Sequence, residues 1–241
     1  MRFGKKGIFY TILIILVGLT IWMTVKGEVG IFKLAPASKV FSAIVRHLQI
    51  VVVAEVLAII VGIPIGFLGT RHSFRFISPV LMGIANVGQT IPTLAFIGIA
   101  GALLGMGYNA AVIALFVYAI LPIIRNTNAG ISTINPAILE AAKGMGMSPM
   151  QVTARVEIPL AMPVIIAGIR TSTVLNVGTA AVAGMIGAGG LGELIVTGIA
   201  VRVTELIIQG AAPTAALAII LDALLNKARD AATPRGLEIR E

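Results

Sequence analysis

Apolar residues run along this chain in long stretches that are separated by short polar segments. Each stretch is close to the ~20 residues that an α-helix needs to cross about 30 Å of hydrocarbon. Six stretches of this kind occur, at residues 8–25, 48–68, 79–100, 109–124, 163–186 and 206–225. The residue-by-residue alternation typical of a transmembrane β-barrel is absent from the sequence. The pattern therefore predicts an all-α integral membrane protein with a bundle of about six transmembrane helices.

The composition indicates that water is not the main solvent of this chain. Hydrophobic residues make up 58% and charged residues 12%, too little polar surface to cover a soluble globule of this length. The chain has no cysteine, and its histidines are His47 and His72, which argues against disulfides and metal sites. Its net charge of +8 comes from basic residues scattered between apolar runs, so we expect no nucleic-acid partner.

The distribution of lysine and arginine predicts the orientation of the chain. In the six-span model one side carries the larger share, Arg2, Lys5, Lys6, Arg71, Arg75, Arg125, Lys143, Arg155, Lys227, Arg229, Arg235 and Arg240. The other side carries Lys26, Lys33, Lys39, Arg46 and Arg202. Because the basic side of a membrane protein is normally cytoplasmic, both termini and the polar loop after the fourth span are expected in the cytoplasm.

The first apolar stretch has a second interpretation, as a secretory signal peptide, because it follows Arg2, Lys5 and Lys6. Its apolar part is longer than the usual 7–15 residues, and the only small-x-small triplet, at 35–37, contains a proline. We interpret residues 8–25 as a retained anchor helix.

The polar loop at 130–162 carries signals for two short helices. Pro136 suits the first turn of a helix that continues to Lys143, and Asn135 suits its N-cap. Gly144 and Gly146 then permit a turn that a Cβ atom would hinder. Ser148-Pro149 suits the start of a second helix, which is expected to end before Pro159.

Three elements of this loop fall in a known register. Glu140-Ala141-Ala142, Gly146 and Val156-x-Ile158-Pro159 resemble the EAA loop by which permease subunits of binding-protein-dependent ABC importers engage their ATPase subunits. Val156 and Ile158 are conservative departures from Ile and Leu. The resemblance implies a type I importer permease-like bundle in which this loop is cytoplasmic. It also implies that Glu140 contacts the ATPase, that Ala141 and Ala142 permit close approach, and that Gly146 permits the sharp turn.

The same resemblance implies partners and a division of the chain. The partners are an ABC ATPase, a second identical or paralogous permease chain, an extracytoplasmic solute-binding protein and membrane lipid. No G-x-x-x-x-G-K-[ST] motif occurs, so ATP and Mg belong to the ATPase and this chain is neither an enzyme nor expected to bind a cofactor. The expected parts are an anchor and linker (1–43), a permease core (44–228) and a cytoplasmic tail (229–241).

Further motifs narrow the family. Residues 86–92 (NVGQTIP), 167–171 (AGIRT) and 186–192 (IGAGGLG) are similar to segments of permeases for osmoprotectants such as glycine betaine, choline and carnitine. With the EAA loop, the likeness covers about residues 45–228. Methionine-type permeases carry a similar glycine-rich stretch, so an amino acid remains an alternative solute.

The glycine-rich segment 187–192 also matches G-x-G-x-x-G, the dinucleotide-binding fingerprint. That motif belongs between a β-strand and a helix, whereas here it follows a membrane-length apolar run. We therefore interpret it as an extracytoplasmic turn that leads into a short helix at about 191–199.

Polar side chains inside the apolar stretches are candidates for the translocation pathway, because they are costly in hydrocarbon. They are Glu55, Asn86, Gln89, Thr90, Arg170 and Asn176. Glu55 and Arg170 are hypothesised to pair, although Arg170 reaching toward the cytoplasmic surface is equally compatible with the sequence. Asp222, near the cytoplasmic boundary, is interpreted as structural.

Two other classes of protein fit the apolar pattern. An ion-coupled secondary transporter would use Glu55 and Asp222 to carry protons or sodium. A membrane-anchored scaffold would use none of these polar groups for transport.

Overall fold

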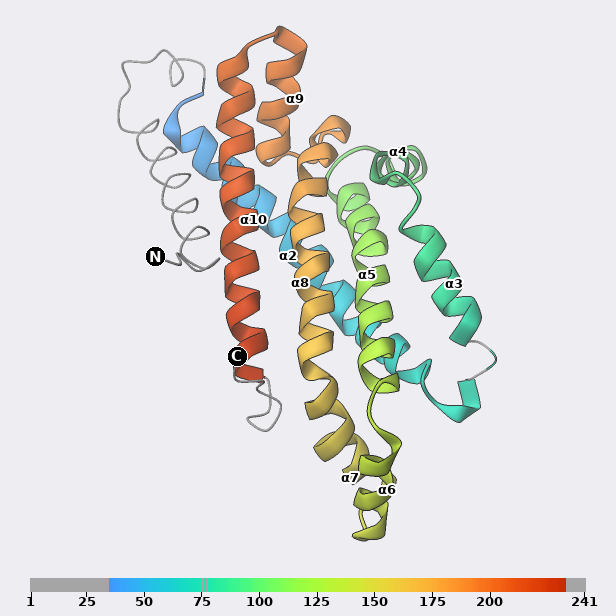
Figure 1. Cartoon of the computed structure of the whole chain (residues 1–241). Helices are drawn as coiled ribbons and strands as arrows, with labels where there is room; N and C mark the ends of the chain where they lie inside the picture. The colour runs from blue at the N-terminus through green and yellow to red at the C-terminus, as the bar shows by residue number, and fades with distance from the viewer. Residues whose placement is uncertain (1–34, 75, 77, 233–241) are drawn as a thin grey trace, which may run out of the picture. The chain divides into compact units, whose positions relative to one another are not determined.

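The computed structural model describes residues 35–74, 76 and 78–232, and in these parts of the chain the regular structure is entirely helical (Figure 1). The elements are α2 (Ala37–Leu68), η2 (His72–Phe74), α3 (Ser78–Gly88), α4 (Thr93–Leu104), α5 (Tyr108–Ser132), α6 (Pro136–Gly144), α7 (Pro149–Val152), η3 (Thr153–Glu157), α8 (Ile158–Val182), η4 (Ala183–Ile186), α9 (Leu191–Val201) and α10 (Thr204–Ala232). The anchor helix predicted at 8–25 lies outside the described residues. The all-α prediction is confirmed for the rest.

The described residues form fewer spans than the six predicted. Four helical segments are long and apolar enough to cross a membrane, namely α2, α5, α10 and the continuous run Pro149–Ile186. A fifth is present if α3 and α4 together count as one broken span. The stretch at 79–100 is interrupted because Pro92 has no N–H to donate and forces Ile91 out of the helical region. The chain turns there, with the Thr90 N–H bonded to the Val87 carbonyl at 2.9 Å.

Helix α5 continues eight residues past the predicted end at Ile124. The sequence predicted a polar loop after the fourth span, whose apolar stretch ends just before Arg125. In the structure the Asn126 side chain donates to the Pro122 carbonyl at 2.8 Å, and Asn128 donates to the Gly66 carbonyl of α2 at 3.3 Å. Both side-chain amides thus donate to backbone carbonyls, and these polar residues are accommodated within a continuous helix.

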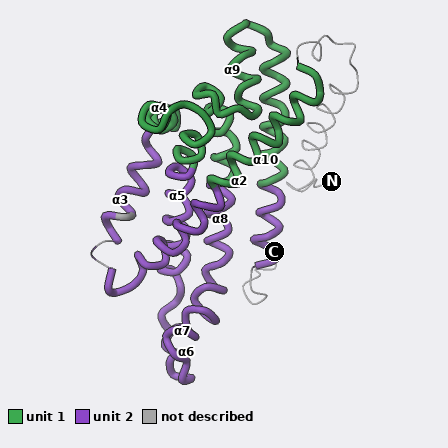
Figure 2. Tube along the Cα trace, turned by 180° about the vertical axis from the view of Figure 1, so that it is seen from behind, with its two compact units in different colours: residues 1–54, 92–115, 173–221 green, residues 55–91, 116–172, 222–241 purple. Residues whose placement is uncertain are grey.

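The described chain divides into two compact units, coloured in Figure 2. In the first (residues 1–54, 92–115 and 173–221, of which 1–34 are not described), Leu191, Leu194 and Leu206 are buried against Ile44 and Leu217. Helix α9 confirms the short helix expected after the glycine-rich segment. It lies so close to the preceding residues that a Cβ on Gly192 would collide with the Ala181 carbonyl.

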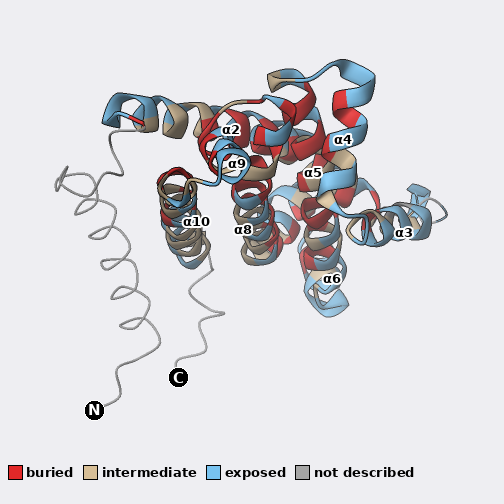
Figure 3. Cartoon of the chain, turned by 90° about the horizontal axis from the view of Figure 1, so that it is seen from above, coloured by how far each residue is buried: buried red, intermediate tan, exposed pale blue. Residues whose placement is uncertain are grey.

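The second unit comprises residues 55–91, 116–172 and 222–241, of which 75, 77 and 233–241 are not described. It has two buried clusters, Ala58 with Ala119 and Ile123, and Ile131 with Ala161 and Ile165. Small residues allow the close backbone approach that membrane helices need, since lipid offers little hydrophobic driving force for association. Helices α3 and α6 are exposed over most of their length (Figure 3).

Candidate functional site

The predicted EAA segment forms the first arm of a helical hairpin, a name used here for residues 135–157. Helix α6 begins with Asn135 as its N-cap, whose Oδ1 accepts from the Ala137 N–H at 3.0 Å, and Pro136 occupies the first turn. Both features agree with the sequence prediction. Pro136 has no N–H, and the Ala137 N–H is bonded by the Asn135 side chain. Two of the four backbone positions that lack a partner at the start of a helix are therefore accounted for.

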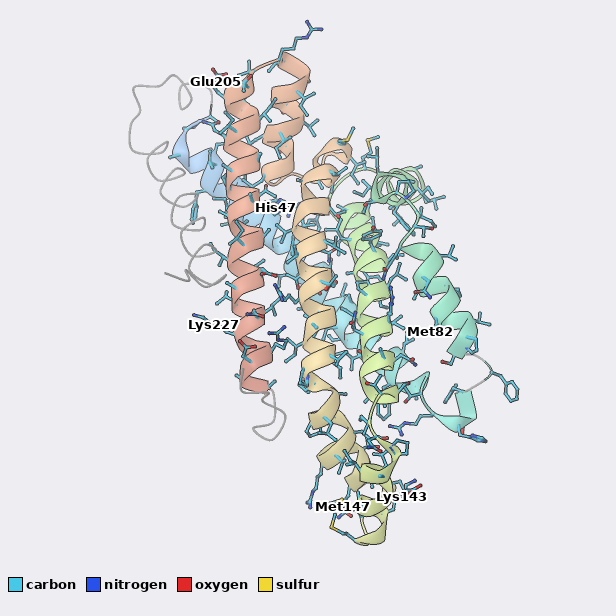
Figure 4. The ribbon with its side chains drawn as sticks, in the orientation of Figure 1. His47, Met82, Lys143, Met147, Glu205 and Lys227 are labelled. Atoms are coloured by element: carbon cyan, nitrogen blue, oxygen red, sulfur yellow. The ribbon has the colours of Figure 1, made fainter. Side chains whose placement is uncertain are left out.

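The turn of the helical hairpin is a Schellman motif centred on Gly146. The Met147 N–H bonds the Ala142 carbonyl at 3.2 Å and the Gly146 N–H bonds the Lys143 carbonyl at 2.9 Å. Gly146 has a φ of 79°, in the left-handed region that favours glycine. Lys143 and Met147, on either side of this turn, are labelled in Figure 4. The sharp turn predicted at Gly146 is present.

Replacing Gly146 by alanine is expected to destabilise this turn by about 1–2 kcal/mol, because a Cβ penalises the left-handed conformation. No neighbouring atom lies within 4 Å of the Cβ position, so backbone strain is the sole cause. Gly144→Ala is the matched control, because Gly144 is equally open but does not adopt a positive φ. Protection of the α6 amides from hydrogen exchange measures both variants. Equal protection in the two would contradict this account of the turn.

The second arm of the hairpin starts as predicted but does not end as predicted. Ser148 caps α7 with a reciprocal capping box, in which the Gln151 N–H bonds Ser148 Oγ and the Ser148 N–H bonds Gln151 Oε1. The helix was expected to stop before Pro159. Instead it passes through the π-helical segment η3 and continues as α8.

The π-helical segment explains how the chain accommodates Pro159. Proline lacks the N–H that would bond the carbonyl four residues earlier, and its ring would collide with that carbonyl in a regular α-helix. In η3 the backbone hydrogen bonds reach five residues back instead of four, as in the bond from the Ile158 N–H to the Thr153 carbonyl. The helical hairpin is therefore continuous with the apolar helix α8.

The EAA residues of α6 have two different environments. Glu140 and Ala141 are exposed, whereas Ala142 is buried in the protein's own interior. Ala142 thus serves the packing of the hairpin, and Glu140 and Ala141 remain available to a partner. Further along, Ile158 is exposed and Val156 and Pro159 are half-buried.

A buried carboxylate that sequence reasoning missed lies in the second arm. Glu157 is 5% exposed, and its two oxygens accept from Arg71 Nη1 at 3.0 Å and Nη2 at 2.5 Å. Thr153 Oγ1 also donates to Glu157, at 2.8 Å. Arg71 follows α2 and is 86 residues away in the sequence, so no local pattern indicates the pair.

The structure gives the hypothesised partners Glu55 and Arg170 different contacts. Arg170 forms a bidentate ion pair with Asp222, Nε to Oδ1 at 2.5 Å and Nη2 to Oδ2 at 2.9 Å. Buried Glu55 accepts from Ser172 Oγ at 3.0 Å. The hypothesised Glu55–Arg170 pair is therefore wrong, since Arg170 pairs with Asp222. Glu55 and Asp222 are both carboxylates within apolar helices, and the sequence alone does not say which of them meets Arg170.

The other pathway candidates are spread over several environments. Asn176 is fully buried, Gln89 is half-buried, and Asn86 and Thr90 are exposed. Thr90 Oγ1 donates to the Val87 carbonyl at 2.7 Å, which helps to end α3. In the described part of the chain no cluster of histidine and carboxylate side chains could hold a metal ion.

Comparison with known proteins shows the family of this chain. Residues 58–235 match the family described as binding-protein-dependent transport system inner membrane component. The chain is 43% identical to the choline transport system permease protein OpuBB of Bacillus subtilis, over 80% of this chain and 88% of the relative. It is 45% identical to the glycine betaine/carnitine/choline permease protein OpuCB of the same organism, with the same coverage. The osmoprotectant import permease protein OsmW of Salmonella typhimurium is 40% identical, over 86% and 97% of the two chains.

Solved structures share the fold at low sequence identity. An inward-facing MetNI methionine ABC transporter aligns with a TM-score of 0.71 at 23% identity, over 81% of this chain and 97% of that one. An amino acid ABC transporter aligns with a TM-score of 0.66 at 19% identity, over 80% and 94%. The described helices therefore have the fold of an ABC importer permease. On the family match, this chain is a multi-pass membrane protein that belongs to the family of inner membrane components of binding-protein-dependent transport systems.

Proposed function

We propose that this chain is the permease subunit of an ATP-driven importer for a small osmoprotectant of the glycine betaine, choline or carnitine type. The observation that carries the proposal is the capped helical hairpin, which exposes Glu140 in the register of the EAA loop. The solute class is supported by the relatives, which transport choline, glycine betaine and carnitine according to their names.

The proposed complex needs other subunits. A separate ATPase binds ATP and Mg²⁺, a second permease chain completes the pathway, and an extracytoplasmic binding protein delivers the solute. The loop at 130–162 and both termini face the cytoplasm, as the lysine and arginine distribution predicts. Closure of the ATPase pair moves α6, the bundle opens outward to receive the solute, and hydrolysis returns it to the inward-open state.

The geometry of the helical hairpin suits the transmission of this movement. Its first arm is capped at Asn135, its turn is closed by two backbone hydrogen bonds at Gly146, and its second arm begins with a capping box. The second arm then runs without a loop into α8, which belongs to a membrane-length segment. A displacement of α6 therefore reaches an apolar helix through hydrogen-bonded backbone.

Transport by purified components tests the proposal. Proteoliposomes that contain this chain, its ATPase and its binding protein should accumulate radiolabelled glycine betaine or choline when ATP is supplied on the ATPase side. Uptake should continue when ionophores dissipate proton and sodium gradients. Uptake that needs an ion gradient and no ATP would instead favour a secondary transporter. Asp222 is poorly suited to carry such an ion, because both of its oxygens accept hydrogen bonds from Arg170.

A charge reversal in the helical hairpin supplies the control. Glu140→Arg should abolish co-purification of the ATPase, because the exposed carboxylate is the proposed contact. Glu205→Arg is the comparison variant, since Glu205 is a half-buried carboxylate in the first turn of α10, outside the hairpin, and should leave co-purification unchanged (Figure 4). Equal retention of the ATPase in both variants would remove Glu140 from the proposed contact.

A further inference from the structure

The contact between Arg71 and Glu157 joins the end of α2 to the second arm of the helical hairpin. We propose that Arg71 and Glu157 are positioning residues, which hold the hairpin in a fixed orientation to α2 so that movement of α6 reaches α2 as well as α8. The inference rests on the proposed function, because it concerns how ATP-driven movement spreads through this chain.

The carboxylate of Glu157 is the centre of the link. It is buried and accepts three hydrogen bonds, two from Arg71 and one from Thr153. A paired guanidinium and carboxylate in this two-point geometry fix orientation as well as distance. Because Thr153 and Glu157 are the two ends of the π-helical segment, the guanidinium is attached to the part of the hairpin that departs from α-helical geometry.

Arg71 is held on the α2 side by an aromatic ring. Its guanidinium carbon lies 4.0 Å from the centre of the Phe67 ring, in a cation–π contact. Phe67 in turn packs against the buried cluster of Ile131, Ala161 and Ile165. One face of the guanidinium thus contacts a half-buried ring that packs on the apolar cluster, and its N–H groups bind the hairpin.

An open pocket of about 690 Å³ lies beside the pair. Phe67 and Arg71 line it from α2 and the residues after it, Leu139 and Lys143 from α6, and Met150 and Glu157 from the second arm. Space remains between α6 and the end of α2 there, so those two elements do not pack tightly across it. The ion pair bridges part of this space through polar side chains, at a point where apolar contact is incomplete.

The link adds a non-covalent connection to the two covalent ones that join the hairpin to the membrane helices. One covalent connection runs from α7 through η3 into α8, and the other runs from α5 into α6 through residues 133–135. The added connection is the chain of contacts from Glu157 through Arg71 and Phe67 to α2. The covalent connections fix the two ends of the hairpin, and the ion pair opposes its movement away from α2. Loss of the ion pair should weaken coupling without removing the exposed surface that contacts the ATPase.

The test uses the complete transporter in proteoliposomes and measures solute imported per ATP hydrolysed. Arg71→Glu and Glu157→Arg should each lower this ratio about ten-fold, within the range seen for residues that transmit coupling, while the ATPase still co-purifies. The double variant with both reversals should regain most of the ratio, because the ion pair is restored with opposite polarity. Arg71→Lys should give an intermediate ratio, since lysine keeps the charge and loses the planar fork.

The controls separate this inference from simpler outcomes. Arg125→Ala removes an exposed arginine on α5 and should leave the ratio unchanged. If Arg71→Glu or Glu157→Arg fails to assemble, Arg71→Lys with Thr153→Val gives the milder comparison, and an unchanged ratio there overturns the inference. It is also overturned if the single reversals keep the wild-type ratio, or if the double reversal is as poorly coupled as each single one. A wild-type complex that imports no solute with ATP would instead refute the proposed function.

Discussion

Replacing Gly192 by alanine is expected to destabilise the protein by about 3 kcal/mol, at the upper end of the usual cost of overpacking. The added Cβ would overlap the carbonyl group of Ala181, and Gly184 makes a similarly close approach to the backbone of Gly192. Backbone atoms cannot rotate away as a flexible side chain can, so α9 must separate from the preceding residues. Thermal unfolding of the purified protein in detergent measures the loss.

Gly178→Ala is the control for this prediction. Gly178 lies within α8, and no atom lies within 4 Å of its Cβ position. Alanine is favoured over glycine in a helix by up to about 1 kcal/mol, so this variant should be neutral or slightly more stable. Equal stability of the Gly192 and Gly178 variants would show that the close approach of α9 is not needed for stability.

Removing the carboxylate that Arg170 binds should have an effect of similar size. In Asp222→Ala the Arg170 guanidinium remains on the apolar helix α8 but loses its ion-pair partner, at an expected cost of about 3 kcal/mol. The double variant Arg170→Leu with Asp222→Leu should be more stable than Asp222→Ala, because it leaves no unpaired charge. Unfolding in detergent is the measurement for both.

An exposed ion pair on α10, the helix that carries Asp222, provides the comparison. Arg229 and Asp230 are adjacent in α10, with side chains 37% and 55% exposed. Asp230→Ala should change stability by no more than about 0.5 kcal/mol, since water screens such pairs. If Asp222→Ala were equally mild, the Arg170–Asp222 pair would have no special role in stability.

Local signals made most of the helical hairpin predictable from the sequence. Asn135 with Pro136, Gly146, and Ser148 with Pro149 each specify a backbone arrangement through the two or three residues beside them, and the structure contains all three. Hydrophobic stretch length similarly predicted α2, α5 and α10. Such features depend on the chain near the residue and not on what packs against it.

The ion pairs could not be predicted because their partners are distant in the sequence. Arg71 and Glu157 are 86 residues apart, and Arg170 and Asp222 are 52 apart. Which carboxylate meets an arginine depends on which helices are neighbours, and hydropathy does not reveal this. The helix boundary at Pro159 was misplaced for a related reason, because a proline normally ends a helix and the π-helical segment that accommodates it has no clear sequence signature.

That segment has a consequence for how the hairpin is aimed. A π-turn contains one residue more than an α-turn, and successive residues of an α-helix are about 100° apart around the axis. The direction in which residues 135–152 project from α8 thus depends on the number of residues from Thr153 to Glu157. Deleting one residue of this stretch would turn that projection by about 100° around α8 and leave the side chains of α6 and α7 unchanged.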